Sequence, residues 1–270
     1  MIANVIAFYL PGNIPIYAYS LIIAIGILIG LWWISQQGTQ RQAASNMYAV
    51  FWALIGAVIC GRTAYLIVNW EYFRYHPFQA LQIQSGGLAW AGALIGGFAV
   101  LMLYAILRRQ KPGELFDAIN PLIGVLAICA WIGCWFAGCS YGAASNAWWG
   151  ILARDEWGQY TPRFPLQLIA AALVAMLFWT LERYAGRKNI RPGTLAGLSW
   201  LGLCILLMSV SLLRADPAPF WRGLRLETWA GLAFVGLSLA AILGVNIDLI
   251  REKLLFLSAR QPRSQVITDD

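Results

Sequence analysis

Three arginines beside apolar segments are the residues most able to do chemistry in this sequence. Arg62 lies inside an apolar segment, close to one end, and Arg163 and Arg214 lie at the ends of two others. A charge at mid-membrane costs about 2.5–3.5 kcal/mol on insertion scales, so it usually faces protein or water. Because a guanidinium binds phosphate through two parallel hydrogen bonds, one hypothesis is a cationic cluster that holds a lipid phosphate. The alternative is that Arg62 extends to the headgroups and the other two anchor their segments at the interface.

Asp117 and His76 are two further candidates. Asp117 begins an apolar segment, where a carboxylate complements the positive end of a helix dipole, so a capping role and a functional role are both open. It is expected at the opposite end of the bundle from Arg62. His76 is the only histidine and precedes Pro77. It could act as a general base, but we favour a loop residue that caps a short helix beginning at Pro77.

Several kinds of site are excluded by their missing motifs. The sequence contains no GxSxG, HExxH or phosphate-binding loop, and the last apolar segment has no lysine for a retinal Schiff base. We therefore expect no metal site and no cofactor, and the catalytic residues stay unknown from these patterns. The net charge of +7 is assigned to cationic loops near anionic lipid instead of to nucleic acid.

The composition places these candidates in a membrane protein. Hydrophobic residues make up 60% of the chain and charged residues 11%, compared with about 25% charged in soluble domains. A helix needs about 20 apolar residues to cross the bilayer, and in lipid its backbone groups must pair internally. Such helices are predicted at residues 16–34, 48–68, 87–107, 117–137, 164–184, 194–213 and 228–247. The fold class is thus all-α: a polytopic membrane bundle of about seven transmembrane helices. We expect one transmembrane domain over residues 1–250 and a polar cytoplasmic tail over 251–270.

The distribution of lysine and arginine predicts the orientation. The loops on one side, which include the stretches 108–111 and 183–191 and the tail, hold about twice as many of these residues as the loops on the other side. The richer side should be cytoplasmic. The N-terminus and the long 138–163 loop therefore face outward, and the C-terminus faces inward. The first basic residue is Arg41, so we expect no cleavable signal peptide.

Small residues in the apolar segments predict close packing. The five cysteines form no CxxC pair and are odd in number, which indicates small buried apolar residues and not a disulfide framework or a zinc site. Four glycine pairs with a spacing of four residues predict close approach of helices. These pairs are Gly26 with Gly30, Gly92 with Gly96, Gly138 with Gly142, and Gly193 with Gly197.

Six short motifs follow one another along the chain. They are Tyr17-Ala18-Tyr19, CGRTAY at 60–65, Gly86-Gly87 with GALIG at 92–96, DAINPL at 117–122, GCWFAGCSYG at 133–142 and PRFPLQL at 162–168. In this order they resemble the prolipoprotein diacylglyceryl transferases of bacterial inner membranes, over roughly residues 15–215. The motif at 133–142 looks like the family signature in its cysteine-bearing form.

The resemblance implies a seven-helix protein of the bacterial plasma membrane with its N-terminus outside. Members move a diacylglyceryl group from phosphatidylglycerol to the cysteine thiol of a lipobox, without a cofactor. The implied partners are phospholipid and a prolipoprotein or other membrane subunits, and no nucleic acid. The resemblance adds Tyr19 and Tyr65, the tyrosines that end the first two motifs, to the candidate site residues.

Five positions depart from the family pattern in a way that bears on catalysis. The family has a histidine, two arginines, a second histidine and a glutamate where this chain has Ala91, Trp131, Leu207, Phe164 and Ser211, while the arginine at Arg214 is kept. The transfer needs a thiolate, and the charge on the departing glycerol phosphate must be stabilised. Each lost electrostatic donor commonly lowers a rate about 10²–10³-fold. Whether the chain is an enzyme is therefore left open.

Two hypotheses follow. In the first, an outward cavity binds phosphatidylglycerol through Arg62 and its cationic neighbours, and an active protein would transfer diacylglyceryl to a lipoprotein thiol. In the second, the chain is a catalytically inactive relative that serves as a lipid-binding or structural subunit of a membrane complex. Arg62 should face an open cavity in the first case, whereas Trp131, Leu207 and Ala91 should fill it in the second. A transporter is a weaker third reading, since no inverted repeat is visible.

Overall fold

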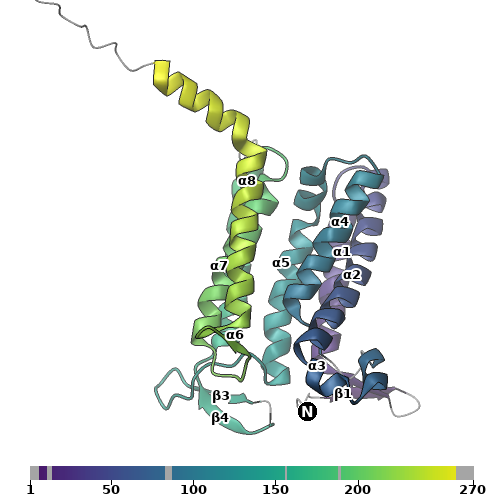
Figure 1. Ribbon diagram of the computed structural model, residues 1–270, viewed down its shortest axis with the longest axis vertical. Helices are drawn as coiled ribbons and strands as arrows, with labels where there is room; N and C mark the ends of the chain where they lie inside the picture. Colours follow the sequence, from purple (N-terminus) through teal and green to yellow (C-terminus); the bar gives the residue numbers. More distant parts are fainter. Residues whose placement is uncertain (1–5, 11–13, 83–86, 156, 188–189, 260–270) are drawn as a thin grey trace, which may run out of the picture.

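The structure is a computed structural model that describes residues 6–10, 14–82, 87–155, 157–187 and 190–259 (Figure 1). Gly86, part of the third motif, and residues 260–270 of the expected tail lie outside the described residues. The last helix continues past residue 250 to Ala259, so the division into a domain over 1–250 and a tail stays a prediction.

Seven helices are long and apolar enough to cross a membrane, as the sequence predicts. They are α1 (Ala18–Ser35), α2 (Gln40–Val68), α4 (Trp90–Leu107), α5 (Pro112–Ala137), α6 (Leu166–Arg187), α7 (Thr194–Leu213) and α8 (Leu226–Ala259). Many of their large apolar side chains point outward, such as Leu28 and Trp32, which are 67% and 64% exposed. Such an apolar outer surface suits lipid and not water.

Short elements that the all-α expectation omitted lie between the helices. Three antiparallel hairpins pair β1 (Ile6–Leu10) with β2 (Ile14–Tyr17), β3 (Ile151–Arg154) with β4 (Tyr160–Arg163), and β5 (Phe220–Trp221) with β6 (Leu224–Arg225). A short helix α3 (Trp70–Phe73) and a 3-10 turn η1 (Pro77–Leu81) follow α2. The hairpins gather at one end of the bundle, at the bottom of Figure 1, which we call the hairpin end. The outward orientation of this end stays a prediction.

Helix α5 is the central element of the bundle. It packs against α1, α6 and α7 and lies between the two halves of the molecule in Figure 1. Half of its apolar stretch is buried inside the protein, more than in any other of the seven helices. Its inner face joins a core near the opposite end, with Leu115, Phe116 and Ile119, and a second core with α6 and α7. The motifs at 117–122 and 133–142 both lie on this helix or directly after it.

Two of the four glycine pairs pack helices together, as predicted. Gly26 and Gly30 of α1 face Cys129 and Leu122 of α5, and Gly92 and Gly96 of α4 face the Cys60 region of α2. Side chains at these positions would collide with the facing helix, so the glycines set the helix distance.

The prediction was wrong for the other two pairs. Gly138 has φ 69° and ends α5, and Gly193 has φ 92° and precedes α7. These are left-handed turn positions that favour glycine for its backbone freedom. Gly142 lies in the loop after α5, against the backbone of Phe164, and only Gly197 packs in a helix, against Ile242 of α8.

Asp117 caps a neighbouring helix. The sequence suggested that Asp117 begins a helix. In the structure α5 begins at Pro112, so Asp117 lies in its second turn. Its two carboxylate oxygens accept hydrogen bonds from the backbone N–H groups of Gly193 (2.6 Å) and Ala196 (2.8 Å), at the start of α7. The capping role is thus observed, but across a helix interface, where it fixes the position of α7 against α5.

The contact between α2 and α4 gives a testable prediction. A Cβ at Gly96 would lie 2.5 Å from Cys60 Cβ and still closer to the Gly56 carbonyl, whereas a Cβ at the adjacent Gly97 would have no neighbour closer than 3.7 Å. Gly96→Ala should lower the free energy of unfolding by about 1–3 kcal/mol through overpacking. Gly97→Ala should be neutral or raise it by about 0.5–1 kcal/mol, because alanine favours the helix. Thermal unfolding in detergent micelles measures both, and equal effects of the two substitutions would contradict this account.

Candidate functional site

The loop after α5 begins with a turn that only a small residue fits. At Gly138 the backbone is left-handed, and a Cβ there would collide with the backbone of Asp155 in the β3–β4 hairpin. The N–H of Cys139 then donates a hydrogen bond to the carbonyl oxygen of Cys134, with an N–O distance of 3.1 Å. This reversal ends the helix and lays the loop over the last turn of α5.

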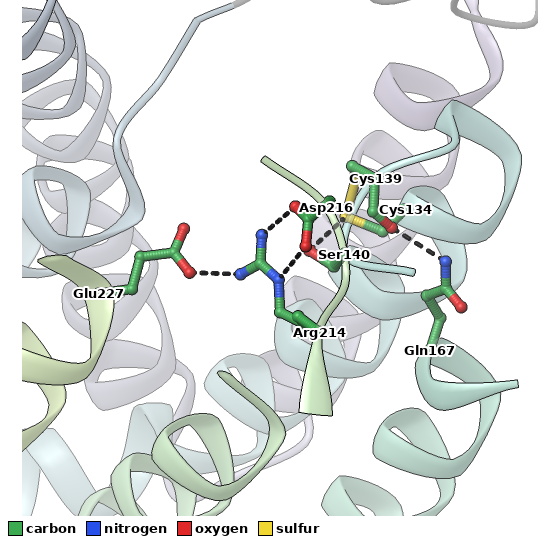
Figure 2. The surroundings of a disulfide bond; sticks show 7 residues. All are labelled: Cys134, Cys139, Ser140, Gln167, Arg214, Asp216 and Glu227. Atoms are coloured by element: carbon green, nitrogen blue, oxygen red, sulfur yellow. Dashed lines mark hydrogen bonds and ion pairs between the residues drawn. A yellow bond between two sulfur atoms is a disulfide. The ribbon is translucent and has the colours of Figure 1, made fainter. Parts of the chain in front are cut away.

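The reversal also pairs Cys134 with Cys139 in a disulfide (Figure 2), so the expectation that no cysteine forms a disulfide was wrong. Within a continuous helix, side chains five residues apart would diverge. Because the helix stops at Gly138, the two Cα atoms lie 4.8 Å apart, within the range of natural disulfides. Cys60, Cys129 and Cys204 are free thiols; Cys204 is buried, as predicted, whereas Cys60 and Cys129 are only partly buried.

Backbone contacts fasten this loop to three other parts of the chain. Gln167 at the start of α6 donates from Nε2 to the carbonyl of Cys139 at 3.0 Å. The carbonyl of Tyr141 accepts the N–H of Ala215 at 2.9 Å. Isolated β-bridges pair Gly142 with Arg214 and Ala144 with Arg163. The motifs at 133–142 and 162–168 are thus brought together with Arg214 at the hairpin end. We call residues 139–144 the signature loop.

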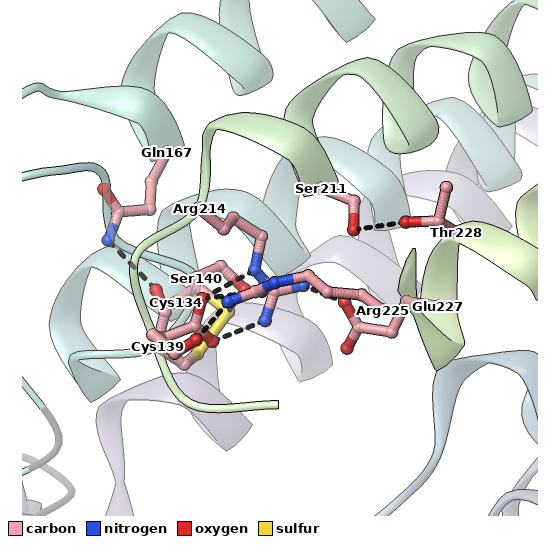
Figure 3. Close-up of polar contacts among 10 residues, drawn as sticks. Cys134, Cys139, Ser140, Gln167, Ser211, Arg214, Arg225, Glu227 and Thr228 are labelled. Atoms are coloured by element: carbon pink, nitrogen blue, oxygen red, sulfur yellow. Dashed lines mark hydrogen bonds and ion pairs between the residues drawn. A yellow bond between two sulfur atoms is a disulfide. The ribbon is translucent and has the colours of Figure 1, made fainter. Parts of the chain in front are cut away.

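Arg214 is held by two carboxylates (Figures 2 and 3). Its guanidinium donates to Asp216 through Nε (2.8 Å) and Nη2 (2.5 Å), and to Glu227 through Nη1. Arg225 also donates to Asp216, both to its carboxylate and to its backbone carbonyl. The side chains of Arg214 and Asp216 are only 13% and 11% exposed, so this is a nearly buried network with matched charges.

The network shifts the pKa values of Arg214 and Asp216 in the directions that favour their charged forms. Burial alone would raise the pKa of Asp216, but the hydrogen bonds and charges of Arg214 and Arg225 outweigh it and lower this pKa. Burial alone would lower the pKa of Arg214, but Asp216 and Glu227 raise it. A guanidinium so engaged has little capacity left for a lipid phosphate.

Arg163 is less completely engaged. At the end of β4, its side chain is 13% exposed and makes one long contact to Asp155, at 3.4 Å from Nη2 to Oδ2. Its guanidinium carbon lies 4.2 Å from the centre of the Tyr141 ring in the signature loop. Its Nε is buried and has no hydrogen-bond partner among the described residues. Of the three predicted arginines, it therefore has the most spare hydrogen-bonding capacity.

Arg62 binds the backbone of its own neighbourhood. Its guanidinium donates to the carbonyls of Ala80 (3.0 Å), Gly87 (3.0 Å), Gln79 (2.7 Å) and Gln82 (3.3 Å), and the residue is only 6% exposed. The charge satisfies carbonyls that η1 and the following segment leave free. Arg62 is buried against these carbonyls, and its assignment to a lipid phosphate stays a prediction without support from this geometry.

Aromatic rings complete the surroundings of Arg62. The ring centres of Tyr65 and Phe73 lie 5.6 and 5.5 Å from its guanidinium carbon. The Tyr65 ring also packs against Gly87, where φ is 85°. Tyr65 is therefore a packing partner of the Arg62 clamp. Tyr19 of α1 packs its ring over Gly133 of α5, which joins the first motif to the signature motif.

His76 is an exposed residue outside this assembly. It directly precedes η1, as predicted, but its side chain makes no capping hydrogen bond. Its ring stacks on Tyr72 at 4.6 Å, and Nδ1 lies 3.1 Å from the Tyr72 carbonyl oxygen. The structure thus links Arg163 and Arg214 through the signature loop, whereas Arg62 and His76 contact other parts of the chain, so the single cluster of three arginines stays a prediction without support from these contacts.

Three positions at which the resemblance implies basic residues meet in one apolar cluster. Trp131 of α5 is 7% exposed and packs with Leu166, Val174 and Leu203. Phe164 and Leu207 pack against the same cluster. The space between α5, α6 and α7 at this level is therefore filled with apolar side chains. Ala91 lies on α4, outside this cluster.

Ser211, where the resemblance implies a glutamate, has a structural partner. Its hydroxyl lies 3.1 Å from that of Thr228, and both residues are buried where α7 meets α8 (Figure 3). The pair fastens the two helices beside the Arg214 network.

A separate cavity of about 510 Å³ opens at the hairpin end. Its lining is apolar: Val68 at the end of α2, Pro219, Phe220, Trp221, and Leu226 at the start of α8. Its lining thus comes from the end of α2 and from the segment that leads into α8.

The sequence patterns did not identify the acidic partners of the arginines. Asp155, Asp216 and Glu227 hold Arg163, Arg214 and Arg225. The closeness of Asp216 to Arg214 in sequence is a signal that could have been used. Glu227 lies on the next helix, and sequence offers no comparable signal for it.

Comparison with known proteins gives a consistent match. The family model described as prolipoprotein diacylglyceryl transferase matches residues 5–244. Three similar proteins all carry the name phosphatidylglycerol–prolipoprotein diacylglyceryl transferase. The one from Bacillus licheniformis is 37% identical over 44% of this chain and 45% of its own length. The one from Trichormus variabilis is 31% identical over 68% and 70%, and the one from Idiomarina loihiensis is 27% identical over 79% and 81%. The chain thus spans less than half of the Bacillus relative and about four fifths of the Idiomarina one.

Removal of the Arg62 guanidinium should release the segment after α2. Arg62→Gln leaves several carbonyls without their donor and should lower the free energy of unfolding by about 3 kcal/mol. The matched control is Arg74→Gln, whose exposed pair with Glu71 should contribute less than about 1 kcal/mol. Thermal unfolding in micelles measures both. A similar small effect for both variants would show that the carbonyl contacts do not hold this segment.

Loss of the disulfide should destabilise the signature loop. For so short a loop, Cys139→Ser should lower the free energy of unfolding by about 2 kcal/mol. A reductant should shift the unfolding of the parent protein in the same way and leave Cys139→Ser unchanged. Cys129→Ser, which removes a free thiol, is the control. Detection of free thiols at both Cys134 and Cys139 in the untreated protein, by peptide mass mapping, would rule out the disulfide.

Proposed function

The chain belongs to the prolipoprotein diacylglyceryl transferase family, and from that premise we propose that it acts on this family's substrates at its hairpin end. The proposed reaction is transfer of diacylglyceryl from phosphatidylglycerol to the lipobox cysteine of a prolipoprotein. The observation that carries it is the assembly of the signature loop, Arg163 and Arg214 in one place. The family match over nearly the whole chain supports the same reading.

The reaction sets clear chemical demands. The cysteine sulfur forms a bond to the glyceryl carbon of the lipid while the bond from that carbon to the phosphate oxygen breaks, and glycerol phosphate departs. The thiol proton must pass to a base, and the departing phosphate needs a cation. Arg163 is the best placed for the phosphate, because its buried Nε has no partner among the described residues and its ion pair with Asp155 is long. No described residue is assigned here as the base.

A second candidate function rests on the apolar cluster. The resemblance implies basic residues at Trp131, Phe164 and Leu207, and these three side chains pack in an apolar core. That arrangement favours a relative that has lost transfer and retains the fold as a lipid-binding or structural subunit of a membrane complex. The apolar cavity at Val68, Phe220 and Leu226 offers room for an acyl chain in either case.

We place the protein in the bacterial plasma membrane with its hairpin end outside. The distribution of basic residues supports this orientation. The disulfide between Cys134 and Cys139 at that end supports it independently, because disulfides persist in oxidising compartments.

Complementation separates the two functions. The full chain is expressed in bacteria depleted of their own diacylglyceryl transferase, and lipoprotein maturation is followed by gel shift. If the chain is an active transferase, it restores maturation, and Arg163→Gln lowers the rate about 10²-fold or more while Arg222→Gln does not.

Correct insertion must be verified for every variant by accessibility labelling of the loops. No maturation by inserted parent protein would exclude transfer in favour of the second function. Phosphatidylglycerol retained by the purified protein, measured by native mass spectrometry and reduced by Arg163→Gln, would then confirm lipid binding. Equal retention by both would exclude Arg163 as the phosphate-binding residue.

A further inference from the structure

A polar layer inside the bundle has no part in the proposed function. It lies near the end opposite the hairpins, where α5, α6 and α7 meet. Asn120 of α5 donates from Nδ2 to Glu182 Oε1 of α6 at 2.9 Å. Asn120 and Ser199 of α7 are both 0% exposed. Asn120 Oδ1 and Ser199 Oγ have no hydrogen-bond partner among the described residues.

Packing contacts place the three side chains at one level. Asp117 of α5 meets Ala196 of α7, and Asn120 and Ser199 each follow three residues later on these helices, which run in the same direction. Each is therefore about 4.5 Å further along its helix and on nearly the same face.

The third helix agrees with this level. Gly124 of α5 packs against Phe178 of α6, which runs the opposite way, so Asn120 and Glu182 lie one turn away on the same side of that contact. Gly202 packs against Leu177 of α6, and Ser199 lies one turn from Gly202 in the same direction. The three residues thus lie at one level of the bundle, where α5, α6 and α7 meet.

The charge of this layer is uncompensated by side chains. None of the ion pairs found in the described part of the chain includes Glu182. Asp117 lies close enough to act on it electrostatically, but the N–H groups and dipole at the start of α7 offset the charge of Asp117. Glu182 is partly buried, and among the described residues its negative charge has no side-chain cation as a partner.

We propose that this layer binds a small alkali cation of the Na⁺ type. A carboxylate, an amide oxygen and a hydroxyl are hard oxygen donors, the type that suits hard cations. One net negative charge balances one monovalent ion, whereas a divalent ion would leave a positive charge in the bundle. The bound ion would occupy the lone pairs of Asn120 Oδ1 and Ser199 Oγ and join α5, α6 and α7. The expectation of no metal site did not foresee this, because only one of the three ligands is charged.

Thermal unfolding of the full chain in detergent micelles tests the site. The unfolding midpoint is measured in NaCl, KCl and N-methyl-D-glucamine chloride at equal ionic strength. With Na⁺ about tenfold above its Kd, the midpoint should rise by about 3–5 °C over N-methyl-D-glucamine. The rise should saturate. A rise in KCl that also depends on Glu182 would support the same site for alkali cations in general.

Two variants and one control keep the test sharp. Glu182→Gln should abolish the Na⁺-dependent rise, and Ser199→Ala, the milder change, should lower the apparent Na⁺ affinity at least several-fold while leaving the protein folded. Glu114→Gln, at the start of α5, should keep the full rise. Equal midpoints in all three salts, or an undiminished Na⁺ effect in both Glu182→Gln and Ser199→Ala, would overturn the proposal. Neither result depends on transfer activity, so the failure of this proposal is distinct from that of the proposed function.

Discussion

The structure depends on one constraint: a charge taken out of water must find partners within the protein. At the hairpin end, each buried arginine meets this requirement with groups from a different segment. Arg62 binds the carbonyls after α2, Arg214 binds carboxylates on the approach to α8, and Arg163 binds the turn of the β3–β4 hairpin. Because removal of one partner would leave a buried charge uncompensated, these contacts fix the loops more firmly than loop backbone alone could.

The same constraint explains why the arginines differ in what they can offer a substrate. A guanidinium whose donors are all occupied by protein acceptors cannot also bind a phosphate without breaking them. Arg62 and Arg214 are close to that limit, whereas Arg163 keeps a buried Nε without a partner in the described part of the chain. The apolar cluster around Trp131 is the opposite case: the space is filled with packed apolar groups, and no charge there needs compensation.

The two ends of the bundle handle charge in different ways. At the hairpin end, cations are paired with carboxylates and carbonyls across loops. At the opposite end, carboxylates lie against helices: Asp117 accepts two N–H groups at the start of α7, and Glu182 accepts one hydrogen bond from the Asn120 amide of α5. Helix α5 links the two arrangements, since its first turns carry Asp117 and Asn120 and its last turn leads into the signature loop. A change in the position of α5 would therefore alter the contacts at both ends of the bundle.

The sequence by itself determined the seven helices, their approximate bounds, the motif order and the family, because apolar length and local motifs are properties of contiguous residues. It also identified Arg163, Arg214 and Asp117 as candidates for a structural or chemical role. It could not pair Arg214 with Glu227, Asp117 with α7, or Asn120 with Glu182, since these partners lie on different helices. It also missed the disulfide, which forms because the chain reverses at Gly138. Only the tertiary structure decided which charges are already satisfied, because that depends on which segments the fold brings within hydrogen-bonding distance.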